Sequence, residues 1–527
     1  MKRYTTYKIF GLALALSLTG CMKDLDQSPI DPDSFTQVQV FANPTEAKSA
    51  LAKVYASYAL TGQQGPNGQG DVAGIDEGYS QFTRLYFAAQ ELTTETAVVG
   101  WADQTIKDFH HLSWSSSDVF ITGLYNRLGQ QISFANSFIS NAEALGTDAE
   151  IKTFIAEARF LRAYSYYCLM DLFGNVPLAT KVQATLPTQS NRKEIFQFVE
   201  SELKAIEGEL KAAKSNEYGR VDAAAAQALL SRLYLNAKTW VGTERYADCV
   251  AYAEKVINSG YALHNDYRQL FMADNDTNGA QNEFIFVLNY DGIQANTWGG
   301  VTNLLLGSIG GDLMEPENYG VVEGWGGYRT TKEFVSKFET KTTNANGEPT
   351  AWNDQRAMFY TDGQSYEISD ISKFTEGYAL PKFTNRTSTG GKGKDPSGKH
   401  PDTDLPIIRL AEIYLNYAEA VVRGGGGSKA TAVGYVNQLR TRAGATPITE
   451  TELTADFILD ERARELYWEG LRRTDLIRYG KFTTADYLWT FKGGAITGVG
   501  TSEHKNIFPI PASVLLANPN LKQNTGY

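Results

Sequence analysis

The pattern that most limits how this chain can fold is a series of long segments whose apolar residues recur every three to four positions. In the segment 151–173, Phe154, Ala158, Leu161 and Leu169 fall on one face of a helix. The same spacing is found in Glu194–Lys211, Asp222–Lys238, Arg245–Asn258, Leu410–Arg423, Ala430–Ala443 and Glu452–Leu471. Each such helix must bury its apolar face against another element, so the fold is predicted to be mainly α.

Short connections predict that several of these helices form antiparallel pairs. The segment 222–238 is followed closely by 245–258, and Gly424–Gly427 joins 410–423 to 430–443. The first helices of both pairs share small and aromatic residues, in Arg232–Ala237 and in Tyr414–Ala418. Helix pairs that bury their faces on one another are typical of tetratricopeptide repeats. We therefore expect a tetratricopeptide-like helix-pair superhelix, with its scaffold at about 120–260 and 405–480.

Two long regions, about 61–115 and 266–403, lack this periodicity. They are rich in Gly, Asn and Asp, and they contain short strand candidates such as Glu283–Leu288. Loops of this length inside a compact protein are usually functional. These insertions are therefore expected to carry a ligand site on the rigid helical scaffold.

The N-terminus has the features of an exported lipoprotein. Lys2, Arg3 and Lys8 precede the apolar run Ile9–Leu18, which is too short to span a bilayer about 30 Å thick as a helix. Small residues then stand directly before Cys21, as in a bacterial lipobox. We expect residues 1–20 to be a signal peptide, Cys21 to carry acyl chains, and residues 21–42 to form a tether. The alternative is an ordinary secretion signal with a chance cysteine.

Charge and cysteine content exclude several classes of protein. The formal net charge of −11 is not the electrostatic footprint of a nucleic-acid-binding protein. Three cysteines cannot build a disulfide framework. We expect Cys168 and Cys249, both in helical patterns, to be buried free thiols, with one helix-to-helix disulfide as the alternative. The five histidines show no zinc-binding spacing.

Four stretches resemble the SusD/RagB family of outer-membrane lipoproteins: Glu157–Pro177, Asp404–Ala420, Glu461–Gly480 and Phe508–Tyr527. Their order and spacing match, and the resemblance covers nearly the whole mature chain, so residues 43–527 are identified as a SusD-like domain. One departure is Val514, where many members carry an acidic residue; it is not a ligand contact in this interpretation. The resemblance implies a cell-surface protein of the outer membrane that passes oligosaccharide to a SusC-like TonB-dependent transporter. It implies neither catalysis nor a cofactor.

The loops resemble those of the family's founding, starch-binding member most closely. The matching stretches are Ser28–Pro32, Thr61–Gly65, Asp76–Gly78, Phe271–Asp276 and Tyr487–Ala495. In that member a coiled α-glucan lies on an arc of three aromatic side chains, and Trp101, Trp298 and Trp325 stand at the matching positions. Arg84 and Gln104 match polar contact positions, the latter with Gln in place of Asn. The implied ligand is starch or a malto-oligosaccharide; another glycan or a peptide is the alternative.

The segment Asp274–Glu283 has the spacing of oxygen-bearing side chains found in calcium loops. Asp274, Asp276 and Asn278 would be the ligands, but Glu283 comes earlier than in an EF-hand. A structural Ca²⁺ and a plain Asx-rich turn are therefore both open interpretations.

Glu461, Glu465 and Glu469 recur every four residues, which raises a competing function. Paired carboxylates carry out glycoside hydrolysis, so a glycosidase is the alternative class. Here they stand among the arginines Arg462, Arg464, Arg472 and Arg473. On such a helix carboxylates more often form ion pairs with neighbouring elements. The sequence therefore predicts that these glutamates have a structural role and that the protein is not an enzyme.

Overall fold

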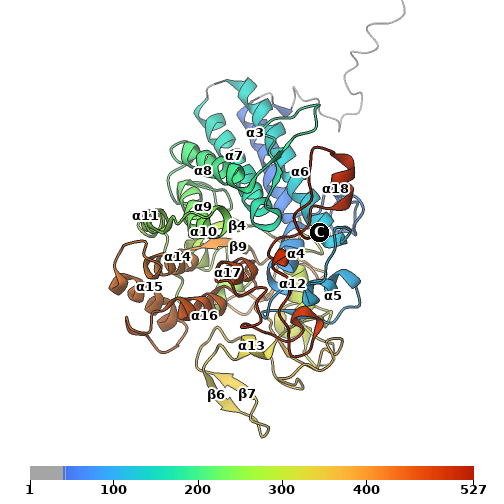
Figure 1. Cartoon of the computed structure of the whole chain (residues 1–527), viewed down its shortest axis with the longest axis vertical. Helices are drawn as coiled ribbons and strands as arrows, with labels where there is room; N and C mark the ends of the chain where they lie inside the picture. Colours follow the sequence, from blue (N-terminus) through green and yellow to red (C-terminus); the bar gives the residue numbers. More distant parts are fainter. Residues whose placement is uncertain (1–39, 42, 147, 312) are drawn as a thin grey trace, which may run out of the picture.

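The computed structural model describes residues 40–41, 43–146, 148–311 and 313–527. The predicted signal peptide, Cys21 and nearly all of the predicted tether lie outside these residues. Helices dominate the described part and strands are short, which confirms the mainly α fold class (Figure 1). The longer helices are α3 (Pro44–Ala59), α5 (Gln104–His111), α6 (Val119–Ala142), α7 (Ala149–Phe173), α8 (Arg192–Ile206), α9 (Ala223–Leu235), α11 (Tyr246–Ile257), α12 (Gly300–Ser308), α14 (Leu410–Val422), α15 (Lys429–Arg442) and α16 (Ala455–Leu466). The shorter helices are α4 (Phe82–Phe87), α10 (Ala237–Val241), α13 (Lys332–Val335), α17 (Arg472–Arg478) and α18 (Ala512–Ala517). The strands are β1 (Val98–Val99), β2 (Val176–Pro177), β3 (Gln189–Ser190), β4 (Phe284–Leu288), β5 (Tyr328–Thr330), β6 (Thr340–Thr343), β7 (Pro349–Trp352), β8 (Tyr378–Ala379) and β9 (Leu405–Arg409).

The helices stack on one another in an order close to that of the chain. Helix α7 packs on α6 and α8, α8 packs on α9, and α9 packs on α11. Helix α11 also packs on α14, which in turn contacts α15 and α16. In Figure 1 this series descends along the left side of the molecule from α8 to α16. The predicted pairs, now α9 with α11 and α14 with α15, are confirmed.

In two of the predicted helices, a side-chain contact coincides with a boundary that differs from the predicted one. The segment 222–238 divides into α9 and α10 at Asn236, whose side-chain amide donates to the carbonyl of Arg232 and so competes with the helical backbone. The segment 452–471 contains only α16, which ends at Leu466. Trp468 has a positive φ of 63°, and its indole N–H donates to the carbonyl of Thr96 at 3.0 Å. A tertiary contact therefore ends this helix earlier than the local sequence pattern predicts.

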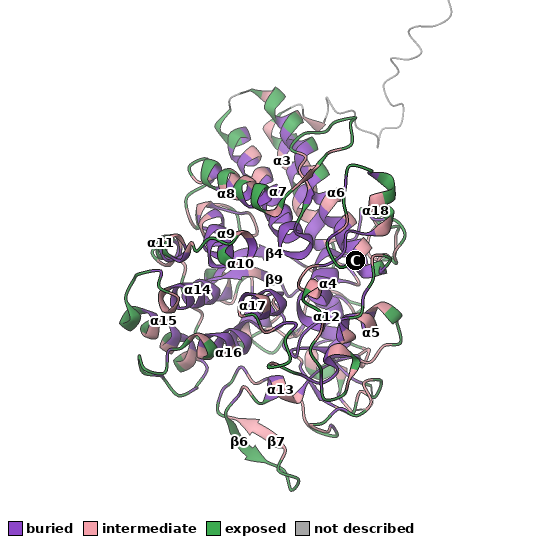
Figure 2. Ribbon diagram, in the orientation of Figure 1, coloured by how far each residue is buried: buried purple, intermediate pink, exposed green. Residues whose placement is uncertain are grey.

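Helix α7 lies at the centre of the hydrophobic core. Every residue from Phe160 to Phe173 is buried, and the helix packs against α3, α6 and α8 (Figure 2). Cys168 on α7 and Cys249 on α11 are both buried and free, so the prediction of two unpaired thiols is confirmed.

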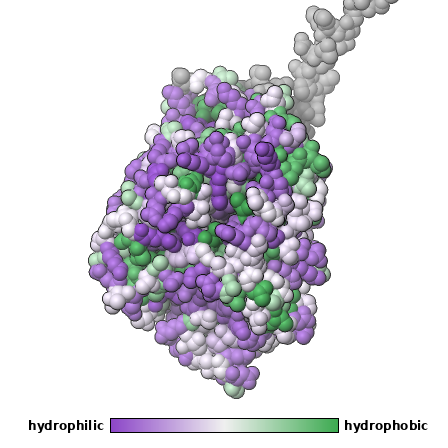
Figure 3. Space-filling model, viewed as in Figure 1, coloured by the Kyte–Doolittle hydropathy of each residue, from purple (hydrophilic) through white to green (hydrophobic). Residues whose placement is uncertain are grey.

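The face of the molecule drawn in Figure 3 is mostly hydrophilic, and its apolar residues form small separate groups. The most exposed large apolar side chain of the described residues is Leu516 on α18, at 87 % exposure. Among the described residues, no helix combines the length and apolar composition needed to cross a membrane.

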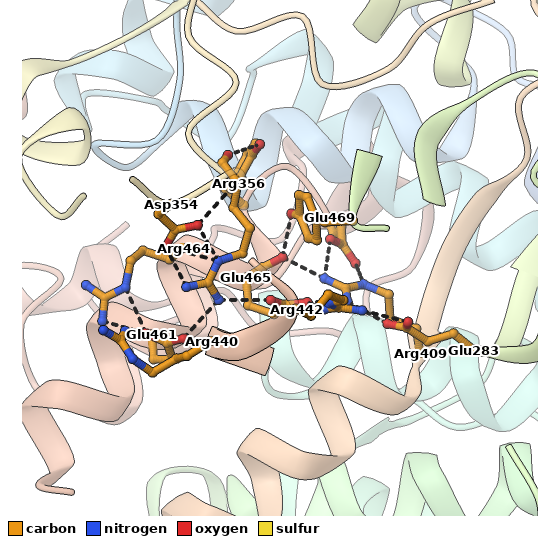
Figure 4. Close-up of polar contacts among 12 residues, drawn as sticks. Glu283, Asp354, Arg356, Arg409, Arg440, Arg442, Glu461, Arg464, Glu465 and Glu469 are labelled. Carbon is orange, nitrogen blue, oxygen red and sulfur yellow. Dashed lines mark hydrogen bonds and ion pairs between the residues drawn. The ribbon is translucent and has the colours of Figure 1, made fainter. Parts of the chain in front are cut away.

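A buried network of ion pairs joins the second insertion to the scaffold (Figure 4). Arg356 contacts Asp354 at 2.6 Å and both Glu461 and Glu465 at 2.9 Å. Arg409, at the end of β9, contacts Glu465, Glu469 and Glu283. Burial raises the pKa of Glu461 and Glu465, but the surrounding arginines more than offset this and lower it to about 2. These carboxylates are charged and paired, which confirms the structural interpretation of this helix.

The two loop-rich insertions meet in a small antiparallel sheet with the strand order β1-β5-β8. Strand β1 belongs to the first insertion, whereas β5 and β8 belong to the second. In the register between them, Val98 lies opposite Arg329 and Val99 lies opposite Tyr328. The residues that follow β1 must therefore lie beside the residues that precede β5.

Candidate functional site

The β1–β5 pairing brings Trp101 and Trp325 together. The N–H of Gly100 donates to the carbonyl of Gly327, which continues the ladder beyond the strands. The loop before β5 is held on the C-terminal end of α12, because the N–H of Trp325 donates to the carbonyl of Leu306 at 2.7 Å. The backbone therefore fixes both tryptophans without relying on their side chains.

Gln81 places Arg84 and Trp298 in the same region. Its side-chain oxygen accepts hydrogen bonds from the N–H groups of Arg84, in α4, and of Gly300, at the start of α12. Its amide group donates to the carbonyl of Tyr58, in α3. Helices α4 and α12 therefore begin at one shared anchor, and Trp298 lies just before α12.

The three indole rings form a bent row with Trp325 in the middle. The ring centroids of Trp325 and Trp101 lie 6.3 Å apart with planes inclined by 58°, and those of Trp325 and Trp298 lie 6.1 Å apart with planes inclined by 42°. All three side chains are half-buried. We call these three residues the tryptophan arc. Adjacent indole faces that tilt in this way can stack on the apolar faces of successive rings of a curved ligand.

The two predicted polar residues have different environments. Arg84 is only 9 % exposed; its guanidinium lies 3.8 Å from the ring centre of Tyr79 and 5.9 Å from that of Trp101. Gln104 is exposed on the first turn of α5, and its amide donates to Asp108 at 2.9 Å. Arg84 is therefore part of the arc's surroundings, whereas the Gln104 side chain bonds within its own helix.

Several neighbours of the tryptophan arc were not predicted from the sequence. Asn67 accepts a hydrogen bond from the indole N–H of Trp298 at 2.7 Å. Glu323 accepts one from the indole N–H of Trp325 at 3.4 Å. Lys399 and His400 approach Trp298 from a segment some hundred residues further along the chain. The sequence around these residues does not predict such contacts, because each contact depends on how distant loops fold together.

The predicted calcium segment forms a hydrogen-bonded turn. The carboxylate of Asp274 accepts from the N–H and the hydroxyl of Ser388 and from the amide of Asn278. In the part of the chain that the structure describes, no group of three or more His, Cys, Asp or Glu residues could hold a metal ion. The Asx-turn alternative describes this arrangement, and Ca²⁺ binding at Asp274, Asp276 and Asn278 stays a prediction of the sequence.

Sequence comparisons place the chain among known proteins. A model described as the SusD family matches residues 353–527, and one described as "Starch-binding associating with outer membrane" matches residues 39–235. The starch-binding protein SusD of Bacteroides thetaiotaomicron is 36 % identical over 98 % of this chain and 97 % of its own length. SusD-like protein P2 of Formosa agariphila is 25 % identical, with 99 % of each chain covered.

Solved structures show the same fold. A SusD superfamily protein of Parabacteroides distasonis matches with a TM-score of 0.70 at 24 % identity, covering 92 % of this chain and 99 % of its own. Surface glycan-binding protein A of Bacteroides thetaiotaomicron, solved with laminarihexaose, matches with a TM-score of 0.69 at 23 % identity, covering 91 % and 99 %. These neighbours share the tetratricopeptide-like architecture, and members of the family bind glycans and are not enzymes. The chain belongs to the SusD family of surface glycan-binding proteins.

Proposed function

We propose that this protein captures starch and malto-oligosaccharides on the tryptophan arc. The observation that carries the proposal is the bent row of rings, because the inclinations of 58° and 42° between neighbouring planes suit a ligand that curves. An α-glucan coils, whereas a cellulose-like chain is straight. Arg84 and Gln104 are the proposed polar contacts to sugar hydroxyls, which orient a ligand held mainly by its apolar faces.

We also propose how the captured glycan reaches the cell. Residues 1–20 are removed as a signal peptide, and lipidated Cys21 with the tether to residue 42 anchors the SusD-like domain, 43–527, to the outer surface of the outer membrane. A SusC-like TonB-dependent transporter then receives the oligosaccharide. Support comes from the lipobox before Cys21 and from the family description of association with the outer membrane.

Isothermal titration tests the ligand. The chain from residue 22 on, which contains every described residue, is titrated with maltoheptaose and α-cyclodextrin, beside laminarihexaose, inulin and xylan. We expect binding to the first two alone. Binding to laminarihexaose instead would move the assignment to β-glucans, the ligand class with which one structural neighbour was solved. If neither α-glucan binds, the starch assignment is contradicted.

Gly327→Ala is expected to weaken glycan binding about tenfold while the fold persists. An added Cβ at this position would lie 2.4 Å from Cε2 of Trp101, so the indole ring must move. Overpacking of this kind costs about 1–3 kcal/mol. Gly434→Ala on α15 is the matched control, since its added Cβ meets no atom within 4 Å. Titration of both variants with α-cyclodextrin checks the prediction, and equal affinities would contradict it.

A further inference from the structure

The imidazole of His400 packs against Trp298, one of the two end rings of the tryptophan arc. The ring centroids of His400 and Trp298 lie 4.5 Å apart, and the two planes are inclined by 52°. His400 is only 7 % exposed, and its buried Nδ1 atom has no hydrogen-bond partner among the residues that the structure describes. The histidine is therefore held at this position by packing on the indole and by its backbone.

The backbone of His400 is fixed by a turn built around Asp395. The Asp395 carboxylate accepts hydrogen bonds from the N–H groups of Ser397, Lys399 and His400 at 2.8 to 3.0 Å. Burial raises the pKa of Asp395, but a hydrogen bond from the Ser397 hydroxyl at 2.6 Å and those from the three N–H groups more than offset this and lower the pKa to about 2. The turn therefore keeps its charged acceptor at all ordinary pH values.

The same turn also contacts the loop of the central tryptophan. The carbonyl of Gly398 accepts from the N–H of Val322 at 3.1 Å. The ammonium of Lys399 lies 3.5 Å from the carboxylate of Glu323, the residue that accepts from the indole N–H of Trp325. One turn, 395–400, therefore touches the surroundings of both Trp298 and Trp325.

We propose that His400 is a positioning residue of the glycan site, which holds the Trp298 ring at its angle to Trp325 and so sets the curvature of the arc. This inference rests on the proposed function. Rings held at a preset angle favour a ligand of matching curvature, because less freedom is lost on binding. A rigid cyclic glucan depends on that angle more than a flexible linear one does.

The charge on His400 offers a readout that needs no ligand. Burial lowers the pKa of His400, and Lys399 lowers it further. Asp395 on its own turn, a hydrogen bond to the backbone of Thr297 and Glu323 on the facing loop raise it, and the net direction is downward. The imidazole therefore takes up its proton at a lower pH than an ordinary histidine does. An imidazolium quenches the fluorescence of an indole that it touches more strongly than a neutral imidazole does.

Tryptophan emission followed from pH 8 down to the lowest pH at which the protein stays folded tests the contact. We expect a fall in emission in the wild-type chain from residue 22 on, with a midpoint below the ordinary histidine value of about 6.5. His400→Phe should remove this fall, whereas His264→Gln should retain it, since His264 bonds Gln269 and not a tryptophan. Circular dichroism at each pH confirms that the fold persists. An unchanged fall in His400→Phe would overturn the inference.

Affinity tests the consequence for the site. We expect His400→Ala to lower affinity for α-cyclodextrin about tenfold and for maltoheptaose only about threefold, and His400→Phe to restore both by refilling the space with a ring. Equal losses for the two ligands, or no rescue by phenylalanine, would overturn the positioning role. If the wild-type protein binds neither glucan, the starch assignment fails, while the fluorescence comparison still decides whether His400 sits on Trp298.

Discussion

Replacing Arg232 with methionine should lower the free energy of unfolding by about 3–5 kcal/mol. Arg232 on α9 and Glu412 on α14 are 3 % and 1 % exposed, and the guanidinium Nε donates to the carboxylate at 2.7 Å. Among the described residues, Arg232 is the only cation that forms an ion pair with Glu412, so without it this charge would stay buried and unpaired. Urea unfolding followed by circular dichroism measures the loss.

Two control variants separate the buried charge from other effects. The double variant Arg232→Met with Glu412→Leu removes both charges and should recover most of the lost stability, because well-packed apolar residues often replace a buried ion pair without loss. Lys238→Met breaks the exposed pair of Lys238 with Glu244 and should leave stability unchanged. A double variant as unstable as Arg232→Met would contradict the electrostatic explanation.

Trp325→Ala should weaken binding of α-cyclodextrin and maltoheptaose by about 30- to 1000-fold, or about 2–4 kcal/mol. Trp325 is the central ring, and each of the other two rings of the arc contacts it. Its removal takes away one stacking surface and the ring that both Trp101 and Trp298 contact. Titration calorimetry of the variant beside the wild type measures the loss.

The fold of this variant should survive, because the backbone N–H of residue 325 still donates to the carbonyl of Leu306. Trp352→Ala is the matched control: Trp352 is also half-buried but packs against Phe359 and Tyr378, on the β6–β7 side of the insertion. Trp101→Ala and Trp298→Ala, at the ends of the arc, should cost about 5- to 30-fold each. Unchanged affinity in all three arc variants would show that the glycan binds elsewhere.

Local sequence patterns were sufficient to predict the helical scaffold. Apolar residues at helical spacing predicted α7, α8, α11, α14 and α15 to within a few residues, except that α8 ends five residues earlier than predicted, because this spacing depends only on near neighbours in the chain. The family stretches were also local, so membership of the SusD family followed from them. The same local logic failed at Trp468, where an indole bonded to Thr96 ends α16 early.

The assembly of the site, in contrast, depends on contacts between segments that are far apart in the chain. Trp101 and Trp325 are separated by 224 positions, and their contact depends on the register of β1 against β5. The loop sequences alone could predict exposed aromatic rings, but they could not predict the angles between those rings. The burial of Arg84, the bond from Trp298 to Asn67 and the packing of His400 likewise arise from segments far apart in sequence. The helical periodicity of a sequence reflects contacts between residues three and four positions apart. The curvature of a binding surface, in contrast, is set by residues that come together only when the chain has folded.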